Sequence, residues 1–159
     1  KRVGVIATES TIHSHLYRTL IQAEDPEITV FGKACPLFVP LVEEGWTKDS
    51  ITREVAGRYL GELLEKDIDT LIMGCTHYPL LRSLLREIVG EKVTLVNPAY
   101  ETAQALKRML SDMNLENQAP GGEPYRFYTS DAAEKFDAFA ASILPCRVPA
   151  AEQIPIEEY

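Results

Sequence analysis

Short apolar runs alternate along the chain with longer stretches in which apolar residues recur every three to four positions. The short runs, rich in branched residues, predict β-strands at 3–7, 28–31, 70–74, 92–96 and 125–129. The longer stretches predict helices at 10–24, 50–66, 79–89, 98–110 and 132–144. Strands that alternate with helices of this length are typical of βαβ units, so we expect an α/β fold. The first four strands predict a three-layer lobe, with a four-stranded parallel sheet between flanking helices.

Two segments interrupt this alternation. Residues 34–45 contain two prolines among apolar residues and predict a long, stiff loop. Residues 114–124 contain two prolines and two glycines and predict a linker. The single strand and helix after the linker are too few to build a core, so we expect them to pack on another surface. The tail after residue 144, which contains three prolines, is expected to be irregular.

Composition and charge narrow the class of protein. The chain has 159 residues, of which 45% are hydrophobic, and a net charge of −8. This apolar content is enough for a core and excludes disorder as the dominant state. No apolar run approaches the ~20 residues of a membrane span, and the acidic balance disfavours nucleic acid and anionic membranes as partners. Residues 1–7 are too short an apolar start for a signal peptide, so we expect a cytoplasmic protein.

The cysteines predict free thiols and no metal site. Cys35, Cys75 and Cys146 cannot all pair with one another, and none belongs to a C-x-x-C motif. With no secretory signal, reduced thiols are expected. His13 and His15 stand two residues apart and point to different faces of a helix, and no third ligand has metal spacing.

The segment 71–81 carries the most chemical information. A predicted strand ends at Gly74, and Cys75, Thr76 and His77 follow it at the edge where a parallel sheet binds ligands. A thiol there lies near a helix N-terminus, whose partial positive charge stabilises a thiolate. His77 can orient or activate a proton-transfer partner, and Thr76 offers a hydroxyl beside backbone N–H groups. The alternative is that Cys75 is a small core residue and His77 a helix cap, and the residues alone leave both open.

Two further segments are expected at the same edge. Glu43 and Glu44 follow the apolar loop, which can press one carboxylate toward the strand ends, although adjacent glutamates are otherwise typical of solvated surface. Thr8 and Thr11 stand three residues apart at a strand-to-helix junction, so both hydroxyls can face one anion. Plain N-capping of the helix is the alternative for these threonines.

Three motifs of this chain resemble those of bacterial glutamate racemase, a member of the aspartate/glutamate racemase superfamily. They are GCTHYPLL at 74–81, CPLFVPLVEEG at 35–45 and the T-x-x-T-x-x-S-x-x-Y spacing from Thr8 to Tyr17. The histidine in the first motif separates the chain from aspartate racemase, where it is typically replaced. The resemblance covers nearly all of residues 1–144 and corresponds to roughly the last three-fifths of a family member.

The resemblance implies a cofactor-independent amino-acid racemase that interconverts L- and D-glutamate and supplies D-glutamate for peptidoglycan. Its site lies between two similar α/β lobes, and two cysteines transfer protons on opposite faces of the α-carbon. Cys75 matches the second-lobe cysteine, His77 a residue that assists it, and Glu43 the acidic residue near that histidine. The residues that match substrate-binding positions are Thr76, His77, Thr8 and Thr11.

The motifs of the family's first lobe are absent from this sequence. That lobe opens with a strand ending in Asp-Ser-Gly and carries its cysteine before Asn-Thr, a context that neither Cys35 nor Cys146 has. We therefore interpret residues 1–99 as the second lobe, and 100–159 as a crossover helix, a linker and a strand–helix segment that returns to the missing first lobe. The implied partners are glutamate, the missing N-terminal lobe and, in the full-length protein, a second copy in a homodimer.

Two hypotheses for function follow from this interpretation. In the first, the parent protein is a glutamate racemase, and the chain as given is inactive because it lacks the first catalytic cysteine. In the second, the chain is a non-catalytic, racemase-like module that binds an acidic ligand or regulates another protein. The missing partner thiol is the feature that keeps the second hypothesis open.

Overall fold

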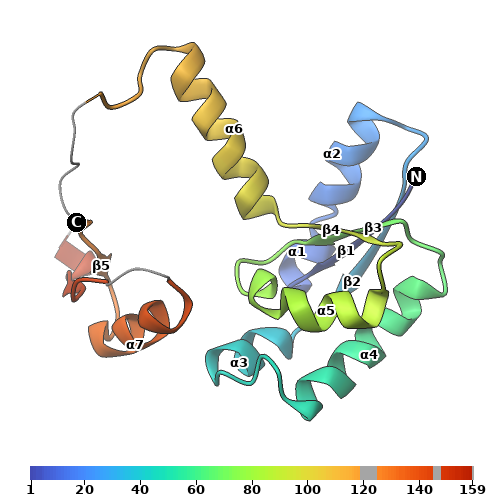
Figure 1. Ribbon diagram of the computed structural model, residues 1–159, viewed down its shortest axis with the longest axis horizontal. Coiled ribbons are helices and arrows are strands. Elements are labelled where there is room, and N and C mark those ends of the chain that lie inside the picture. Colours follow the sequence, from blue (N-terminus) through green and yellow to red (C-terminus); the bar gives the residue numbers. More distant parts are fainter. Residues whose placement is uncertain (119–124, 145–147, 159) are drawn as a thin grey trace. The chain divides into compact units, whose positions relative to one another are not determined.

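The computed structural model describes residues 1–118, 125–144 and 148–158 (Figure 1). The chain divides into two units, Lys1–Leu115 and Glu116–Tyr159. The observed division thus falls after Leu115, whereas the sequence predicts a boundary between residues 99 and 100. The assignment of these two parts to the lobes of a larger protein stays a prediction.

The first unit is a parallel sheet flanked by helices. The strands are β1 (Arg2–Ala7), β2 (Thr29–Ala34), β3 (Thr70–Met73) and β4 (Thr94–Val96). The helices are α1 (Glu9–His13), α2 (Leu16–Glu24), α3 (Phe38–Glu43), α4 (Ser50–Leu64), the 3₁₀ helix η1 (Tyr78–Leu81), α5 (Arg82–Val89) and α6 (Pro98–Asp112). All strand pairs are parallel, in the order β2-β1-β3-β4. The predicted α/β fold with a four-stranded parallel sheet and flanking helices is confirmed.

The core is built on β1, which pairs with a neighbour along both edges. Its residues from Val3 to Ala7 are buried, because helices cover both faces of the sheet. On one face, Val3, Val5 and Val30 form a cluster on which α1 and α2 pack through partly buried side chains such as Ile12. α4 and α5 lie against the other face (Figure 1). Successive strand residues therefore alternate between two apolar layers.

The predicted helix 10–24 is wrong in one respect, because the chain breaks there into α1 and α2. His15 adopts a left-handed backbone with φ 56°. The Ser14 hydroxyl fixes this break: it donates to the carbonyl oxygen of Thr11 at 2.8 Å and accepts from the Leu16 N–H at 3.3 Å. The apolar spacing runs through the break unchanged, so periodicity alone could not reveal it.

The predicted loop at 34–45 is also wrong, because part of it is the helix α3. Phe38 and Val42 are buried on one side of this helix. Pro40 does not prevent the helix, because it lies in the first turn, where its missing N–H would have had no partner within the helix. α3 ends at Glu43, so a helix rather than a loop carries this carboxylate.

The second unit is small. Its elements are β5 (Tyr128–Thr129), α7 (Ala133–Ile143), β6 (Glu152–Gln153) and the 3₁₀ helix η2 (Ile156–Glu158). The tail is not wholly irregular as predicted, since β6 pairs in parallel with β5. Ala140 is the one buried apolar residue among those described in this unit, consistent with the expected lack of a core. Residues 119–124 of the predicted linker and Cys146 lie outside the described residues.

Helix α6 begins where Pro98 follows β4, with Asn97 as its cap: the Asn97 side chain accepts from the Ala99 N–H at 3.1 Å. The helix has no buried residue. Tyr100, Leu106 and Met109 are each more than half exposed. Neither α6 nor any other helix in the described ranges has the length and apolar character that crossing a membrane requires.

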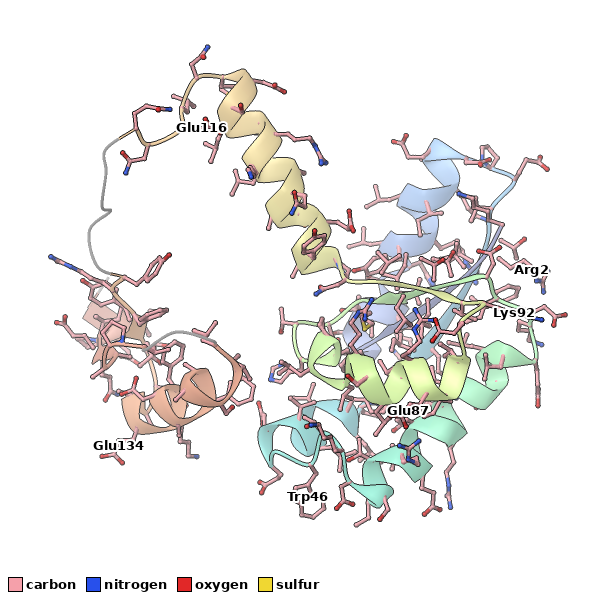
Figure 2. The ribbon with its side chains drawn as sticks, in the orientation of Figure 1. Arg2, Trp46, Glu87, Lys92, Glu116 and Glu134 are labelled. Carbon is pink, nitrogen blue, oxygen red and sulfur yellow. The ribbon has the colours of Figure 1, made fainter. Side chains whose placement is uncertain are left out.

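The starts of β1 and β3 are joined by the Asp69 carboxylate. The N–H of Arg2, a residue labelled in Figure 2, donates to Asp69 Oδ2 at 2.9 Å, and the Thr70 hydroxyl donates to Asp69 Oδ1 at 2.7 Å. These two hydrogen bonds hold the pKa of Asp69 below the ordinary value for aspartate, and the bond from Arg2 has the larger effect. Asp69 is exposed, so the net stabilisation is modest.

We expect Asp69→Asn to lower the free energy of unfolding by about 0.5–1 kcal/mol at neutral pH. A carboxyl group with a lowered folded-state pKa stabilises the fold above its unfolded pKa, and that contribution is lost as the pH falls. The difference between variant and parent should therefore shrink below about pH 4 in urea unfolding experiments. Asp67→Asn removes a neighbouring charge and is the matched control. An equal difference at neutral and acid pH would contradict this account.

Candidate active site

The predicted site residues gather at the carboxyl edge of the sheet. Thr8 follows β1 directly, Cys75 lies two residues after β3, and Glu43 ends the helix that follows β2. The sheet register brings these three strand ends together, since Ala7 pairs with Ala34 on β2 and Ile6 with Met73 on β3. Residues far apart in the sequence thus meet at one edge, as the parallel topology predicts.

A cavity of about 260 Å³ opens beside Cys75. Cys75 itself is partly buried. The start of α6 forms part of its wall, so the positive end of a 15-residue helix lies at the cavity. Residues that line it include Tyr17, Gly74, Cys75, Thr76, Asn97 and Thr102.

Glu43 and His77 form a pair next to this cavity. The Glu43 Oε1 and His77 Nε2 atoms are 3.3 Å apart. On the other side of the ring, His77 Nδ1 lies 3.3 Å from the Thr76 hydroxyl. The imidazole ring therefore contacts the Glu43 carboxylate through one nitrogen and the Thr76 hydroxyl through the other, and these two contacts orient the ring. His77 is three-quarters buried, whereas Glu43 is mostly exposed.

The two predicted threonines contact each other rather than the cavity. The Thr8 and Thr11 hydroxyl oxygens are 3.1 Å apart, and the Thr8 hydroxyl also lies 3.3 Å from that of Ser10. Thr8 occupies the N-cap position of α1, but its side chain makes no capping hydrogen bond. The capping alternative therefore does not account for its hydroxyl. Thr11 lines a separate cavity of about 140 Å³ on the α1–α2 side of the sheet.

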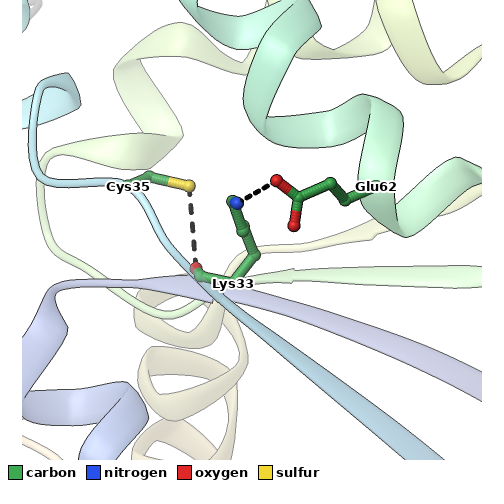
Figure 3. A network of polar contacts seen from close by, with 3 residues as sticks. All are labelled: Lys33, Cys35 and Glu62. Atoms are coloured by element: carbon green, nitrogen blue, oxygen red, sulfur yellow. Dashed lines mark hydrogen bonds and ion pairs between the residues drawn. The ribbon is translucent and has the colours of Figure 1, made fainter.

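Cys35 is the second described thiol, and it is a structural residue. It is completely buried, and its Sγ donates to the carbonyl oxygen of Lys33 at 3.6 Å (Figure 3). The pKa of Cys35 is raised to about 12, and burial of the thiol is the largest cause. The Lys33 ammonium acts in the opposite direction, whereas the Glu62 carboxylate, which pairs with Lys33, adds to the rise. Cys35 therefore stays protonated at neutral pH.

The two longest racemase-like motifs, residues 35–45 and 74–81, are joined by a hydrogen bond and a ring contact. The Tyr78 hydroxyl donates to the carbonyl oxygen of Cys35 at 2.8 Å. The Tyr78 and Phe38 rings meet edge to face, with their centroids 5.2 Å apart. Tyr78 is completely buried, which raises the pKa of its phenol and keeps it a hydrogen-bond donor. These contacts hold α3, which carries Glu43, against the turn that carries Cys75 and His77.

Reasoning from the sequence missed two contributors to the cavity wall, Tyr17 and Thr102. Tyr17 ends the T-x-x-T-x-x-S-x-x-Y spacing, which is a signal that could have singled it out. Thr102 follows Pro98 by four residues, which returns it to the same face of α6. Within the described residues, Thr8, Thr11, Glu43 and His77 do not line the cavity beside Cys75.

This fold and site define a class of protein: an α/β domain that presents a thiol and a histidine–carboxylate pair at the carboxyl edge of a parallel sheet. Residues 1–106 match the family model described as Asp/Glu/Hydantoin racemase, and the chain belongs to this family. The resemblance that the motifs indicate is confirmed.

Individual relatives are named glutamate racemases. The chain is 42% identical to the glutamate racemase of Lactiplantibacillus plantarum over 144 residues. This alignment covers 90% of the chain and 53% of the relative. The chain is also 42% identical to the glutamate racemase of Thermoanaerobacter sp. strain X514. This alignment covers 100% of the chain and 60% of the relative. The chain thus spans little more than half the length of these curated relatives.

Solved structures agree with this assignment. The structure of Francisella tularensis glutamate racemase in complex with D-glutamate matches with a TM-score of 0.91 and 35% identity, over 99% of this chain and 59% of that one. The Thermus thermophilus glutamate racemase in complex with beta-chloro-D-alanine matches with a TM-score of 0.87 and 34% identity, over 100% and 58%.

Gly74→Ala tests how closely the chain packs beside Cys75. An added Cβ would lie 3.0 Å from the Tyr17 ring and 3.1 Å from the Ile6 carbonyl oxygen, which already accepts the Gly74 N–H. Because that oxygen belongs to the sheet backbone and cannot move freely, we expect Gly74→Ala to lower the free energy of unfolding by about 1–3 kcal/mol. Urea unfolding measures this difference.

Gly57→Ala is the matched control for this substitution. A Cβ at Gly57 meets no described atom within 4 Å and lies inside α4. We therefore expect Gly57→Ala to raise the free energy of unfolding by about 0.5–1 kcal/mol. Equal effects of the two substitutions would contradict the close packing at Gly74.

Proposed function

We propose that this chain carries one half of the active site of a glutamate racemase, in which Cys75 exchanges the α-proton of glutamate. The observation that carries the proposal is the position of Cys75, on the wall of a cavity at the carboxyl edge of the sheet and two residues from the paired His77. The family of the chain and the names of its relatives support a racemase of glutamate.

Racemisation needs two proton-transfer groups. A thiolate at Cys75 takes the α-proton, and the electron pair of the broken C–H bond is delocalised into the substrate carboxylate. A second thiol then returns a proton to the opposite face of the planar carbanion, which Cys75 cannot reach. The carbanion is costly in water, so the site must exclude water and aim dipoles at the carboxylate. The N-terminal end of α6 supplies one such dipole at the cavity.

Each remaining site residue has a proposed role. His77 assists Cys75 as a proton-transfer partner, and Glu43 fixes the orientation of the imidazole through the 3.3 Å contact. Thr76 and His77 bind glutamate beside the thiol. Thr8 and Thr11 also bind glutamate, with their linked hydroxyls turned toward it when the complete site forms.

The second thiol comes from outside the described residues. Cys35 cannot serve, because it is buried, protonated and bonded to the Lys33 carbonyl. We propose that a further, N-terminal lobe supplies it, and that the exposed apolar residues of α6 and the segment 100–159 pack on that lobe. We further propose a cofactor-independent, cytoplasmic enzyme that acts as a homodimer and supplies D-glutamate for peptidoglycan.

The test is proton exchange at the α-carbon, measured by NMR with glutamate in D₂O and a longer form of the protein that carries both lobes. Exchange should be rapid in the parent, and Cys75→Ala should slow it by a factor of at least about 10². Cys35→Ala, which removes the buried thiol, is the matched control and should retain exchange. Exchange of aspartate but not glutamate would contradict the proposed substrate.

The 159-residue chain alone should not exchange the α-proton, because it offers a proton-transfer group on one face only. Exchange by this chain that disappears in Cys75→Ala would contradict the two-thiol mechanism. Calorimetry with D-glutamate separates the competing hypothesis: tight binding by the chain, together with no exchange by the longer form, would support a non-catalytic binding module instead.

A further inference from the structure

The Tyr17 side chain lies against Gly74, the residue between β3 and Cys75. A Cβ added at Gly74 would meet the Tyr17 Cε2 atom at 3.0 Å and its Cζ atom, which bears the hydroxyl, at 3.2 Å. The absence of a side chain at Gly74 therefore allows the ring to lie directly against the backbone that leads into Cys75.

The local backbone keeps Tyr17 in this place. The left-handed conformation of His15 separates α1 from α2, and the Ser14 hydroxyl accepts from the N–H of Leu16, the first residue of α2. α2 therefore begins at Leu16, one residue before Tyr17. The break means that Tyr17 does not occupy the position that a single continuous helix from Glu9 would give it. The ring also packs against the apolar cluster of Val3, Val5 and Val30, which restricts its movement.

Tyr17 and Cys75 line the same cavity. Burial, and to a lesser extent the charge of Cys75, raise the pKa of the Tyr17 phenol. The phenol is therefore neutral at physiological pH and able to donate a hydrogen bond.

Two other titratable groups lie near Cys75, but their polar atoms are occupied. The Tyr78 hydroxyl donates to the Cys35 carbonyl oxygen, and the burial of Tyr78 places this bond within the core. The His77 ring is held between Glu43 and Thr76. The Tyr17 hydroxyl makes no hydrogen bond within the described part of the chain, so it is available to the thiol.

We propose that Tyr17 is a positioning residue for Cys75: its ring, packed on Gly74, fixes the strand end that carries the thiol, and its hydroxyl stabilises the thiolate from the cavity wall. As a role in proton exchange, this rests on the proposed racemase function. The contact itself does not, because it concerns the reactivity of Cys75 in this chain. A hydrogen bond to a charged sulfur is stronger than one to a neutral thiol, so the hydroxyl favours the ionised form.

The experiment compares Tyr17→Phe with the parent 159-residue chain. Iodoacetamide alkylates thiolates, and peptide mass spectrometry reports the rate at Cys75 separately from the other cysteines. Tyr17→Phe keeps the ring on Gly74 and removes only the hydroxyl. We expect the rate at neutral pH to fall about tenfold, and the pH at which the rate is half-maximal to move upward, with an unchanged unfolding midpoint.

Tyr59→Phe is the matched control. Tyr59 packs edge-on against Phe38 with a centroid distance of 5.3 Å and lies outside the cavity, so its hydroxyl should not affect Cys75. An alkylation rate and pH dependence in Tyr17→Phe equal to those of the parent would overturn the proposal. Because no glutamate is involved, that outcome is separate from failure of the racemase function, which the exchange experiment alone reports.

Discussion

Parallel pairing of the four strands is the constraint on which the site depends. β1 is bonded on both sides, so that Val5 pairs with Gly32 on β2 and with Ile72 on β3. Parallel strands all end at the same edge, so the segments that follow them converge there although the sequence separates them widely. Without this register, neither the cavity beside Cys75 nor the pair of Glu43 and His77 would form.

A second layer of contacts makes the converging segments rigid. The Tyr78 hydroxyl binds the end of β2 through the Cys35 carbonyl, and the Phe38 ring packs on Tyr78. Glu43 and His77 therefore belong to one packed body, and their contact does not depend on two mobile loops. In the proposed racemase, a site held in this way would lose little freedom on binding glutamate, which would favour precise proton transfer.

The sequence predicts the four strands of the main sheet, and the position of Cys75 at the carboxyl edge of that sheet, for a physical reason. Strands buried on both faces are largely apolar, and only Gly74 separates Cys75 from the end of one of them. The sequence does not predict the helix α3, because two prolines within residues 34–45 are typical of a loop. Only Pro40 lies in the helix, in its first turn, which tolerates proline. The break at His15 is local, held by the hydrogen bonds of the Ser14 hydroxyl, but the apolar spacing that predicts the helix continues through it. The contact of Tyr17 with Gly74 joins residues far apart in the sequence, so no local pattern predicts it.

The central claim is that the carboxyl edge of the sheet is where glutamate binds, and an NMR titration of the ¹⁵N-labelled 159-residue chain with D-glutamate tests it most directly. The account predicts saturating shifts of the backbone amides of Cys75, Thr76 and His77, and of those in the first turn of α6. The amides of α7 should not move. Saturating shifts confined to residues 125–158, or no saturating shift at 75–77, would contradict the account.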